Sequence, residues 1–563
     1  MQPQVSAMLL ALCPLLAQAA PPVAPSAGTI LQQIPPPTTA ATPAPSTSGS
    51  ILKVQGAGEV AGSGTASAPF VVKQIEIVGN TIFDTATLQV LVAPAEGQKW
   101  TIDDLNVQAG KITSYYRDRG YILTRAIIPV QSIRGGVVRI QVVEARYGKT
   151  TLDNKSKVRE YLMQSAMGPL QSGTSIESEQ LDAALLKMSD IPGVFINATL
   201  TPGESVAGSA DLLVIATPGP TLSGNMAVDN YGNYYTGQAR IGGTANVINP
   251  LQHGDVLTGT VLSAGKGMNY GRLGYEALIN GQGSRLGTSY SALRYVLGES
   301  LEPLNAHGTA GVASVWVKHP WLRGQERNLY ASVQYDYLKL SDHIDASAIQ
   351  TDRHVSNLTA TLSGDGRDRF DGLNIWSASV MGGRIGFDNA NALLADAATA
   401  RTAGSFTKLN LNLSRLQRIA AQDDLYFSYI GQWSNSNLDP SQKLTAGGVY
   451  TVRAYNMGAV SGDSGYTGTV EWRHDLNLGS VATGRWQVVG LIDHAHLTIN
   501  KNPWTAGSNG VSLSGAGAGI NWSGLQQWNA RAYVTTRVGG TPALLANTAT
   551  TRLWIEVNKA FLQ

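Results

Sequence analysis

The chain has 563 residues, of which 43% are hydrophobic and only 14% are charged. It is therefore too long for one ordinary compact domain and poor in charge for a soluble protein of this size. Its 41 Lys and Arg residues nearly balance its 39 Asp and Glu residues, giving a formal net charge of +2, which argues against nucleic acid and against any partner held by bulk charge.

The first 69 residues predict a targeting segment and a linker. Residues 1–19 contain an apolar run followed by the small-x-small site Ala17-Gln18-Ala19, the pattern of a secretory signal peptide, although no basic residue precedes the run. The only cysteine, Cys13, lies inside this segment, so we expect a mature protein without disulfides or cysteine-based zinc sites. Residues 20–69 are rich in Pro, Ala, Ser and Thr. They predict a short helix near 24–34 and a linker.

Two small α/β modules follow, at residues 70–148 and 149–219. In the first, FVVKQIEIVGN predicts a strand, and apolar residues at helical spacing predict a helix over 101–120. The second has a similar order, with helices predicted near 155–167 and 177–189. The order strand, helix, helix, strand, strand thus occurs twice, and neither module holds a catalytic constellation.

From about residue 221 to residue 563, alternating apolar and polar residues replace helical periodicity. In NLYASVQYDYLKL the alternation runs to Tyr337 and stops at Lys339, where a strand would leave the hydrocarbon. No segment here offers the roughly 18 apolar residues of a transmembrane helix, so a membrane-spanning form has to be a closed barrel. A soluble sandwich would expose more charge. The region therefore predicts a transmembrane antiparallel β-barrel of about 16 strands, with about 10 residues in each strand.

Residues 462–465 read GDSG, the surroundings of a trypsin-like serine nucleophile at Ser464. The candidate bases, His474 and His494, have the parity of lipid-facing residues in their strands, so neither is expected to reach a loop serine. The glycines and the short polar residues instead predict a turn. The HAH stretch at 494–496 lacks a third metal ligand in the sequence, and we expect neither a metal nor a cofactor.

The opposite parity of the same strands predicts polar side chains in the lumen, among them Glu471 and Arg473. Asp493 lies there within the otherwise apolar run GLIDHA and needs a partner. Arg453 is the candidate if the long segment at 440–465 folds back into the barrel, because a guanidinium can hold a carboxylate through two parallel hydrogen bonds. The alternative is that each group is a hydrated lumen charge.

Together these residues resemble the outer-membrane transporters of two-partner secretion, the haemolysin secretion/activation (TpsB) family, over nearly everything after residue 70. GYILTRAIIPVQ at 120–131 is similar to its periplasmic POTRA modules, which makes the two α/β modules POTRA 1 and POTRA 2. VDNYGNYYTG at 228–237 and NPLQHGD at 249–255 resemble the start of its barrel. KLTAGGVYTVRAY at 443–455, followed by GDSG and Glu471, resembles its long loop, whose hallmark is Val-Arg-Gly-Tyr/Phe.

The resemblance implies export of one large, unfolded partner protein through the outer membrane of a Gram-negative bacterium. The partner would be a secreted TpsA-like exoprotein of the haemolysin or adhesin type, and the periplasmic POTRA modules, residues 70–219, would bind its N-terminal segment. Outer-membrane lipid would surround the barrel. The helix near 24–34 would plug the pore at rest. The resemblance also implies a lumen-loop lock, formed by Val452, Arg453, Tyr455 and Asp493 and supported by Glu471 and Arg473.

One residue departs from the family pattern: Ala454 stands where the family has glycine. Because glycine permits a positive φ and close backbone approach, the geometry of the loop tip is left open. Three other functions remain open from the sequence. They are an assembly factor of the Bam/Tam type, a general diffusion porin, and an esterase or protease that depends on Ser464.

Overall fold

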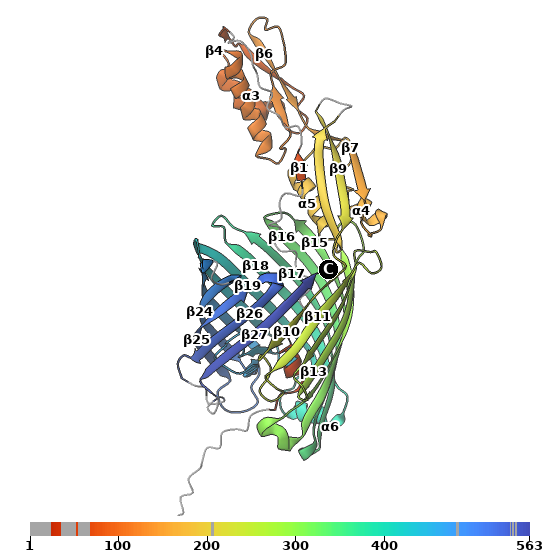
Figure 1. The fold of residues 1–563 in the computed structure, drawn as a ribbon, viewed down its shortest axis with the longest axis vertical. Coiled ribbons are helices and arrows are strands. Elements are labelled where there is room, and N and C mark those ends of the chain that lie inside the picture. Colours follow the sequence, from red (N-terminus) through yellow and green to blue (C-terminus); the bar gives the residue numbers. More distant parts are fainter. Residues whose placement is uncertain are drawn as a thin grey trace, which may run out of the picture.

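The computed structural model describes residues 24–34, 52–54, 68–203, 208–479, 483–540, 542, 545 and 549–562. The predicted signal peptide lies outside the described residues, as does most of the predicted linker. Two α/β modules are stacked beyond one end of a β-barrel (Figure 1). None of the described helices is long and apolar enough to cross a membrane.

The first module contains a three-stranded sheet in the order β3-β6-β5, a two-stranded ribbon of β2 and β4, and two helices. Its elements are β2 (Phe70–Val71), β3 (Gln74–Val78), α2 (Thr85–Val92), β4 (Lys99–Trp100), α3 (Ile102–Arg117), β5 (Arg125–Ile127) and β6 (Val137–Val143). The sequence predicts one continuous strand from Phe70. This prediction is wrong, because the strand is interrupted between Val71 and Gln74. Val72 is buried, and so are Ile75 and Ile77 of β3. The interruption changes the side-chain alternation, so that Val72 and the isoleucines of β3 all point into the core.

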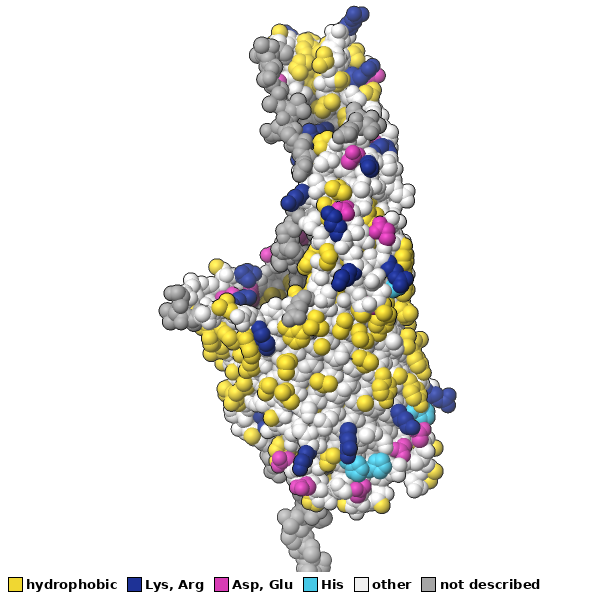
Figure 2. All heavy atoms as spheres, turned by 45° about the vertical axis from the view of Figure 1, so that its right-hand side comes forward, with side chains coloured by type: hydrophobic (Ala, Val, Ile, Leu, Met, Phe, Trp, Pro, Cys, Tyr) yellow, Lys and Arg dark blue, Asp and Glu magenta, His cyan; other side chains and the backbone are white. Residues whose placement is uncertain are grey.

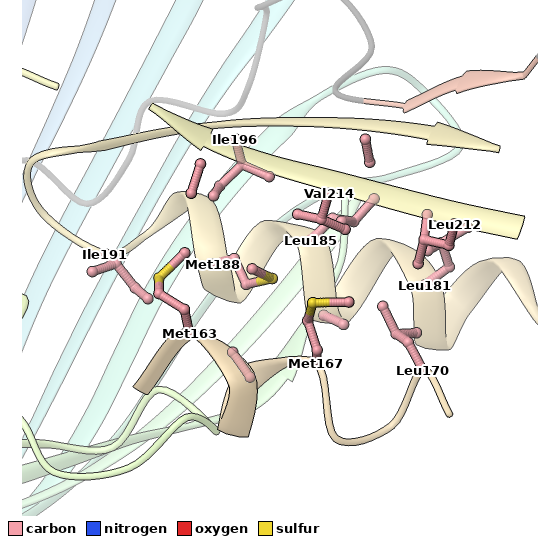
Figure 3. Packing of buried hydrophobic residues seen from close by; sticks show 14 of the residues in the cluster. Met163, Met167, Leu170, Leu181, Leu185, Met188, Ile191, Ile196, Leu212 and Val214 are labelled. Atoms are coloured by element: carbon pink, nitrogen blue, oxygen red, sulfur yellow. The ribbon is translucent and has the colours of Figure 1, made fainter. Parts of the chain in front are cut away.

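The second module has a four-stranded sheet in the order β1-β8-β9-β7. Its elements are β7 (Arg146–Asn154), α4 (Glu160–Ala166), α5 (Ser178–Ser189), β8 (Val194–Pro202) and β9 (Ser209–Pro218), joined by β1 (Leu52–Val54) from the N-terminal segment. β1 runs parallel to β8 and covers its outer edge. Apolar side chains of α4 and α5 pack against the sheet, with Leu185 facing Val214 and Met163 close to Met188 (Figure 3).

Within the described residues, sixteen antiparallel strands form the closed barrel, as the sequence predicts. β27 closes it by pairing with β10, from Ser223 opposite Leu562 to Asp229 opposite Glu556. The strands are β10 (Leu222–Asp229), β11 (Arg240–Ile248), β12 (Val256–Ser263), β13 (Met268–Leu278), β14 (Arg285–Val296), β15 (Ala306–Arg323), β16 (Arg327–Ile344), β17 (Ile349–Arg367), β18 (Leu373–Phe387), β19 (Gly404–Ala420), β20 (Asp423–Ser434), β23 (Ser464–Leu476), β24 (Arg485–Thr498), β25 (Gly510–Ser523), β26 (Trp528–Arg537) and β27 (Thr551–Leu562).

The barrel wall has an apolar outer face. On the face seen in Figure 2, hydrophobic side chains cover the middle of the barrel and charged side chains gather toward its ends. Tyr335, which the alternation places outward, is 47% exposed. The other exposed apolar residues with the predicted outward parity include Val333, Tyr337, Leu409, Phe427, Trp433, Leu553 and Ile555. This alternation is the pattern of strands with hydrocarbon outside and polar groups inside.

The second module contacts the barrel end nearest to it through polar groups. Arg323 at the end of β15 donates from Nε and Nη2 to the two carboxylate oxygens of Asp190, at 2.7 and 2.9 Å. The β11–β12 turn belongs to the NPLQHGD stretch, and the carbonyl of Gln252 accepts a hydrogen bond from the backbone of Arg159 at 3.0 Å. Asp255 is fully buried and accepts from the backbone N–H groups of Leu251 and His253. The turn motif thus shapes a docking site for the second module.

Candidate functional site

The segment between β20 and β23, residues 435–463, folds back inside the barrel. We call it the lumen loop; it contains a short ribbon of β21 (Leu444–Ala446) and β22 (Val460–Gly462). The chain reverses sharply at Gly447 and Gly448, which have φ values of 102° and 101°. At Gly447 a Cβ would lie 2.5 Å from the carbonyl oxygen of Asn456. The paired glycines therefore allow the tip to close, and residues 452–455 are buried beneath it.

Arg453 at this tip reaches two strands of the barrel wall. Its Nε and Nη2 donate to Asp493 of β24 at 2.9 and 2.8 Å, and its backbone N–H donates to the same carboxylate at 3.0 Å. Its Nη1 donates to Glu471 of β23 at 2.6 Å. Thr469 donates a further bond to Asp493 at 2.9 Å, and Arg473 holds the second oxygen of Glu471 at 2.6 Å. Arg453 and Asp493, the pair expected if the loop folds back into the barrel, are therefore in direct, bidentate contact.

The arginine cluster is buried and electrostatically matched. Asp493 is 0% exposed, while Arg453 and Glu471 are almost as inaccessible. The carboxylates of Asp493 and Glu471 both lie against the Arg453 guanidinium, so its charge is compensated on two sides. Removing one member of a buried, hydrogen-bonded ion pair leaves an uncompensated charge and costs more than the pair itself contributes. The cluster is thus suited to hold the loop in one position.

The rest of the tip is also fixed. The carbonyl of Arg453 accepts from Thr535 Oγ1 at 2.8 Å and from Trp554 Nε1 at 2.7 Å. Val452 and Tyr455 are buried in an apolar cluster with residues of β24 and β25. The guanidinium of Arg537 lies 4.7 Å from the centre of the Tyr455 ring. The tip is therefore held by the loop residues on both sides of the arginine.

Ala454 fits the tip without the freedom of a glycine. It does not adopt a positive φ, and its side chain is completely buried. A Cβ built on Gly515 of β25 would lie 2.6 Å from the Cβ of Ala454. The methyl group at position 454 is therefore accommodated because the opposing wall residue has no side chain.

The GDSG stretch anchors the end of the lumen loop. Asp463 is fully buried, and its carboxylate accepts from Lys443 at 2.8 Å and from the backbone N–H groups of Leu438 and Lys501. The hydroxyl of Ser464 accepts from the backbone of Ser434 at 3.0 Å. The two histidines contact other groups, His474 with Asp423 and His494 with Ser514, each at 2.9 Å. The structure thus brings neither histidine to Ser464.

A short helix, α1 (Ala27–Leu31), lies inside the barrel (Figure 1, red) and packs against the inner faces of β14, β15 and β16. Ser26 caps its first turn, and the N–H of Ala27 donates to Asp342 of β16 at 2.7 Å. The same carboxylate accepts from Arg353 of β17 at 2.7 Å, and Arg353 also donates to Asp439 of the lumen loop. This second ion cluster links helix, wall and loop.

Asn233, in the VDNYGNYYTG stretch, joins the same parts at another point. Its Nδ2 donates to the side-chain oxygen of Gln33 at 3.0 Å and to the carbonyl of Met457 at 3.1 Å. Gln32 donates to the carbonyl of Ser441 in the loop. Sequence reasoning identified neither Asn233 nor the Asp342, Arg353 and Asp439 cluster as part of the site; only the unusual motif around Asn233 could have drawn attention to it.

Comparison with known proteins gives matches over both parts of the chain. The profile of the POTRA domain, ShlB-type, matches residues 70–145, and that of the haemolysin secretion/activation protein ShlB/FhaC/HecB matches residues 208–522, more than half of the chain. The heme/hemopexin transporter protein HuxB of Haemophilus influenzae is 27% identical over 411 residues, which are 72% of this chain and 73% of that protein. The outer membrane transporter CdiB of Dickeya dadantii is 21% identical over 487 residues, 80% of each.

Among solved structures, CdiB from Escherichia coli has a TM-score of 0.70 at 18% identity, covering 89% of this chain and 92% of that one. This likeness shows a shared fold. The matched family consists of transporters and not of enzymes, in keeping with the contacts of Ser464. Because its profile spans more than half of the sequence, the chain belongs to the haemolysin secretion/activation (ShlB/FhaC/HecB) family, outer-membrane β-barrels with periplasmic POTRA modules that secrete partner exoproteins.

Proposed function

We propose that the structure represents the resting state of a pore that exports one large, unfolded exoprotein, and that the Arg453 cluster is the lock that holds the lumen loop in place. The partner would be a TpsA-like protein of the haemolysin or adhesin type. The observation that carries the proposal is the set of three hydrogen bonds from Arg453 to Asp493 together with the bond to Glu471. These bonds tie a long loop to two wall strands at one point.

The interior would have to rearrange before a chain could pass. Helix α1 and the lumen loop both occupy the lumen. Hydrogen bonds that involve side chains join both to the wall, and among the described residues neither is paired with a strand of the barrel. Such contacts can break without opening the sixteen-stranded barrel. Helix α1 is accordingly the plug and the lumen loop the second obstruction in this proposal.

Capture of the partner would take place on the POTRA modules. In the first module, β5 lies at the edge of its sheet, where an extended segment can add as a further strand. In the second module the corresponding edge strand, β8, is covered by β1. We therefore assign capture to β5, and Ile127, which is exposed there, offers a position for cross-linking to the N-terminal segment of the exoprotein.

The decisive experiment is secretion by an Arg453→Ala variant. The exoprotein should stay inside the cell while the barrel still inserts in the outer membrane, which heat-modifiable migration on gels would check. Arg531→Ala is the matched control, because this arginine of β26 lies 3.7 Å from Glu556 of the neighbouring strand and should be dispensable. Normal secretion by Arg453→Ala would refute the lock, and loss of many outer-membrane proteins would favour an assembly factor.

A further inference from the structure

The outer face of the barrel carries a broad groove that the secretion mechanism does not use. Its volume is 1180 Å³, and it crosses β10 to β16 with a lining that is mainly apolar. One row of directly paired residues forms its floor: Met226, Gly243, Val261, Gly271, Ala292, Gly311 and Lys339. Four of these seven are Gly or Ala, and Gly and Ala also make up four of the seven residues in the next row toward the periplasm, so the wall is hollowed across both rows.

The two rows beside the floor differ in character. Toward the periplasm the row is apolar and includes Leu273 and Tyr290, which are both strongly exposed on the outer face. Toward the cell exterior the row is polar from β12 to β16 and includes Asn269, Arg294 and Thr309. The groove therefore has an apolar body that lies in the membrane and a polar rim at the outer surface.

Two basic side chains mark the rim: Arg294 belongs to the polar row, and Lys339 ends the floor row on β16. Arg294 of β14 and Lys339 of β16 are exposed, and within the described residues neither head group makes a hydrogen bond or an ion pair. The acidic group closest to them in register is Asp352 of β17, which accepts from Ser341 and Gln350. Lys339 pairs in register with His354, whose ring contacts Asp388. Two cations thus stand at the rim of an apolar groove without a protein partner.

We propose that this groove binds a phosphorylated, multiply acylated glycolipid of the lipid A type from the outer leaflet. The acyl chains would lie over Gly243, Gly271 and Gly311, and Arg294 and Lys339 would hold the phosphate groups. Basic residues at a membrane surface attract anionic head groups in this way, and glycine on an outer strand face leaves room for a chain to lie close. A second copy of the chain fits this groove less well. In a symmetric contact the same patch of both copies meets, so the cations of both would lie together without acidic partners.

The site can be tested by native mass spectrometry of the full-length protein in detergent, titrated with hexa-acylated diphosphoryl lipid A, its monophosphoryl form, or phosphatidylethanolamine. Arg294→Gln with Lys339→Gln should weaken diphosphoryl lipid A binding roughly thirty-fold, since each basic group near an anionic surface contributes a factor of about five. Arg384→Gln is the matched control, because Arg384 is exposed on β18 but does not line the groove.

A second pair of variants tests the apolar body. A Cβ at Gly259 or Gly271 would meet no atom within 4 Å, so Gly259→Leu with Gly271→Leu should fill the groove without disturbing the fold and should reduce binding of all acylated forms. Gly382→Leu on β18, equally open, should leave binding unchanged. Unaltered lipid A binding by both double variants would overturn the proposal. If phosphatidylethanolamine bound as tightly as lipid A, the occupant would be a phospholipid in general and not lipid A. If the variants that fill the groove lost a dimer, the occupant would be a second copy of the chain.

Discussion

The POTRA modules bury a mainly apolar core, whereas the barrel lumen buries charged side chains beside its apolar clusters. In the second module, Leu185 and Met163 are inaccessible in a core of apolar residues. In the lumen the groups with equally little exposure include Arg453, Asp493 and Arg353. The difference follows from the surroundings: water outside the modules drives apolar groups inward, whereas hydrocarbon outside the barrel accepts them, so that charges collect within. Position in the lumen therefore depends on electrostatic pairing as well as on packing, whereas position in the modules depends mainly on packing.

The sharpest way to test the comparison is to remove a lumen charge. Asp493→Ala leaves Arg453 with only Glu471 as an anionic partner, and breaking a buried pair costs about 3–5 kcal/mol. We expect the lumen loop to leave its position while the barrel stays folded, so that protease added to whole cells cleaves within residues 435–463. Secretion should fall as in the Arg453→Ala variant.

Asp475→Ala is the matched control for this loss. Asp475 belongs to β23 and pairs with Arg485 at 2.6 Å near the periplasmic end, where Arg485 is exposed and Asp475 is partly exposed. Exposed pairs contribute about 0–1 kcal/mol, so the loop should remain protected. A protected loop in Asp493→Ala would show that apolar contacts of Val452 and Tyr455 suffice to hold it.

The converse change removes a packed apolar side chain from a module. Leu185→Ala should destabilise the second module by about 2–5 kcal/mol, through lost burial and the cavity left behind. Leu409→Ala deletes the same atoms from a side chain that is 49% exposed on the barrel exterior and should change module stability little. Proteolysis of the modules in increasing urea would measure both; equal effects would contradict the division between the two regions.

Much of this division could be predicted from the sequence, because alternation fixes which side of a strand a residue occupies. Alternation alone places Asp493 and Glu471 on the inner face of the barrel and His494 on the outer face. The contact of Arg453 with Asp493 required one further step, that a lone carboxylate in an apolar run needs a partner. Both steps rest on local patterns, and that is why they succeeded.

The second ion cluster could not be predicted in this way. Asp342 and Arg353 lie near the ends of β16 and β17, beyond the stretch in which apolar and polar residues alternate. Asp439 lies in a loop whose sequence shows no hydrophobic periodicity. Only the three-dimensional path of helix α1 and the lumen loop brings them together. The interruption of the strand after Val71 could not be predicted for a related reason. A continuous run of β-forming residues does not show where strand pairing stops and starts again.

A buried charge within the first module offers a smaller, pH-dependent test. Glu144 accepts hydrogen bonds from the backbone of Thr81 and Ile82 and from the hydroxyl of Tyr116, at 2.7, 2.8 and 2.8 Å. Burial raises the pKa of this carboxyl, but the hydrogen bonds outweigh it and leave the pKa below its usual value. Its contribution is therefore complete above the pKa of the unfolded chain, about 4.3, and is lost as the pH falls through the folded value.

Glu144→Gln should remove this dependence and cost about 1.5–3 kcal/mol at neutral pH, the range for hydrogen bonds to a charged group. Hydrogen exchange of residues 79–83, corrected for its intrinsic pH dependence, would report the opening of the segment. Glu76→Gln is the control, because Glu76 pairs with Arg139 on the exposed surface. If Glu144→Gln keeps the acid sensitivity of the parent protein, that sensitivity arises from another titratable group.

The smallest effect is expected where the two regions meet, at the pair of Arg323 and Asp190. Asp190 is partly exposed, so Arg323→Gln should cost only about 1 kcal/mol. The modules should stay folded but lie at a wider range of angles to the barrel. Spin labels at Phe195 and Phe370, both exposed, would show a broader distance distribution, which Arg139→Gln should leave unchanged. An unchanged distribution in Arg323→Gln would mean that the β11–β12 turn alone fixes the docking, so that backbone contacts and not charge govern the junction.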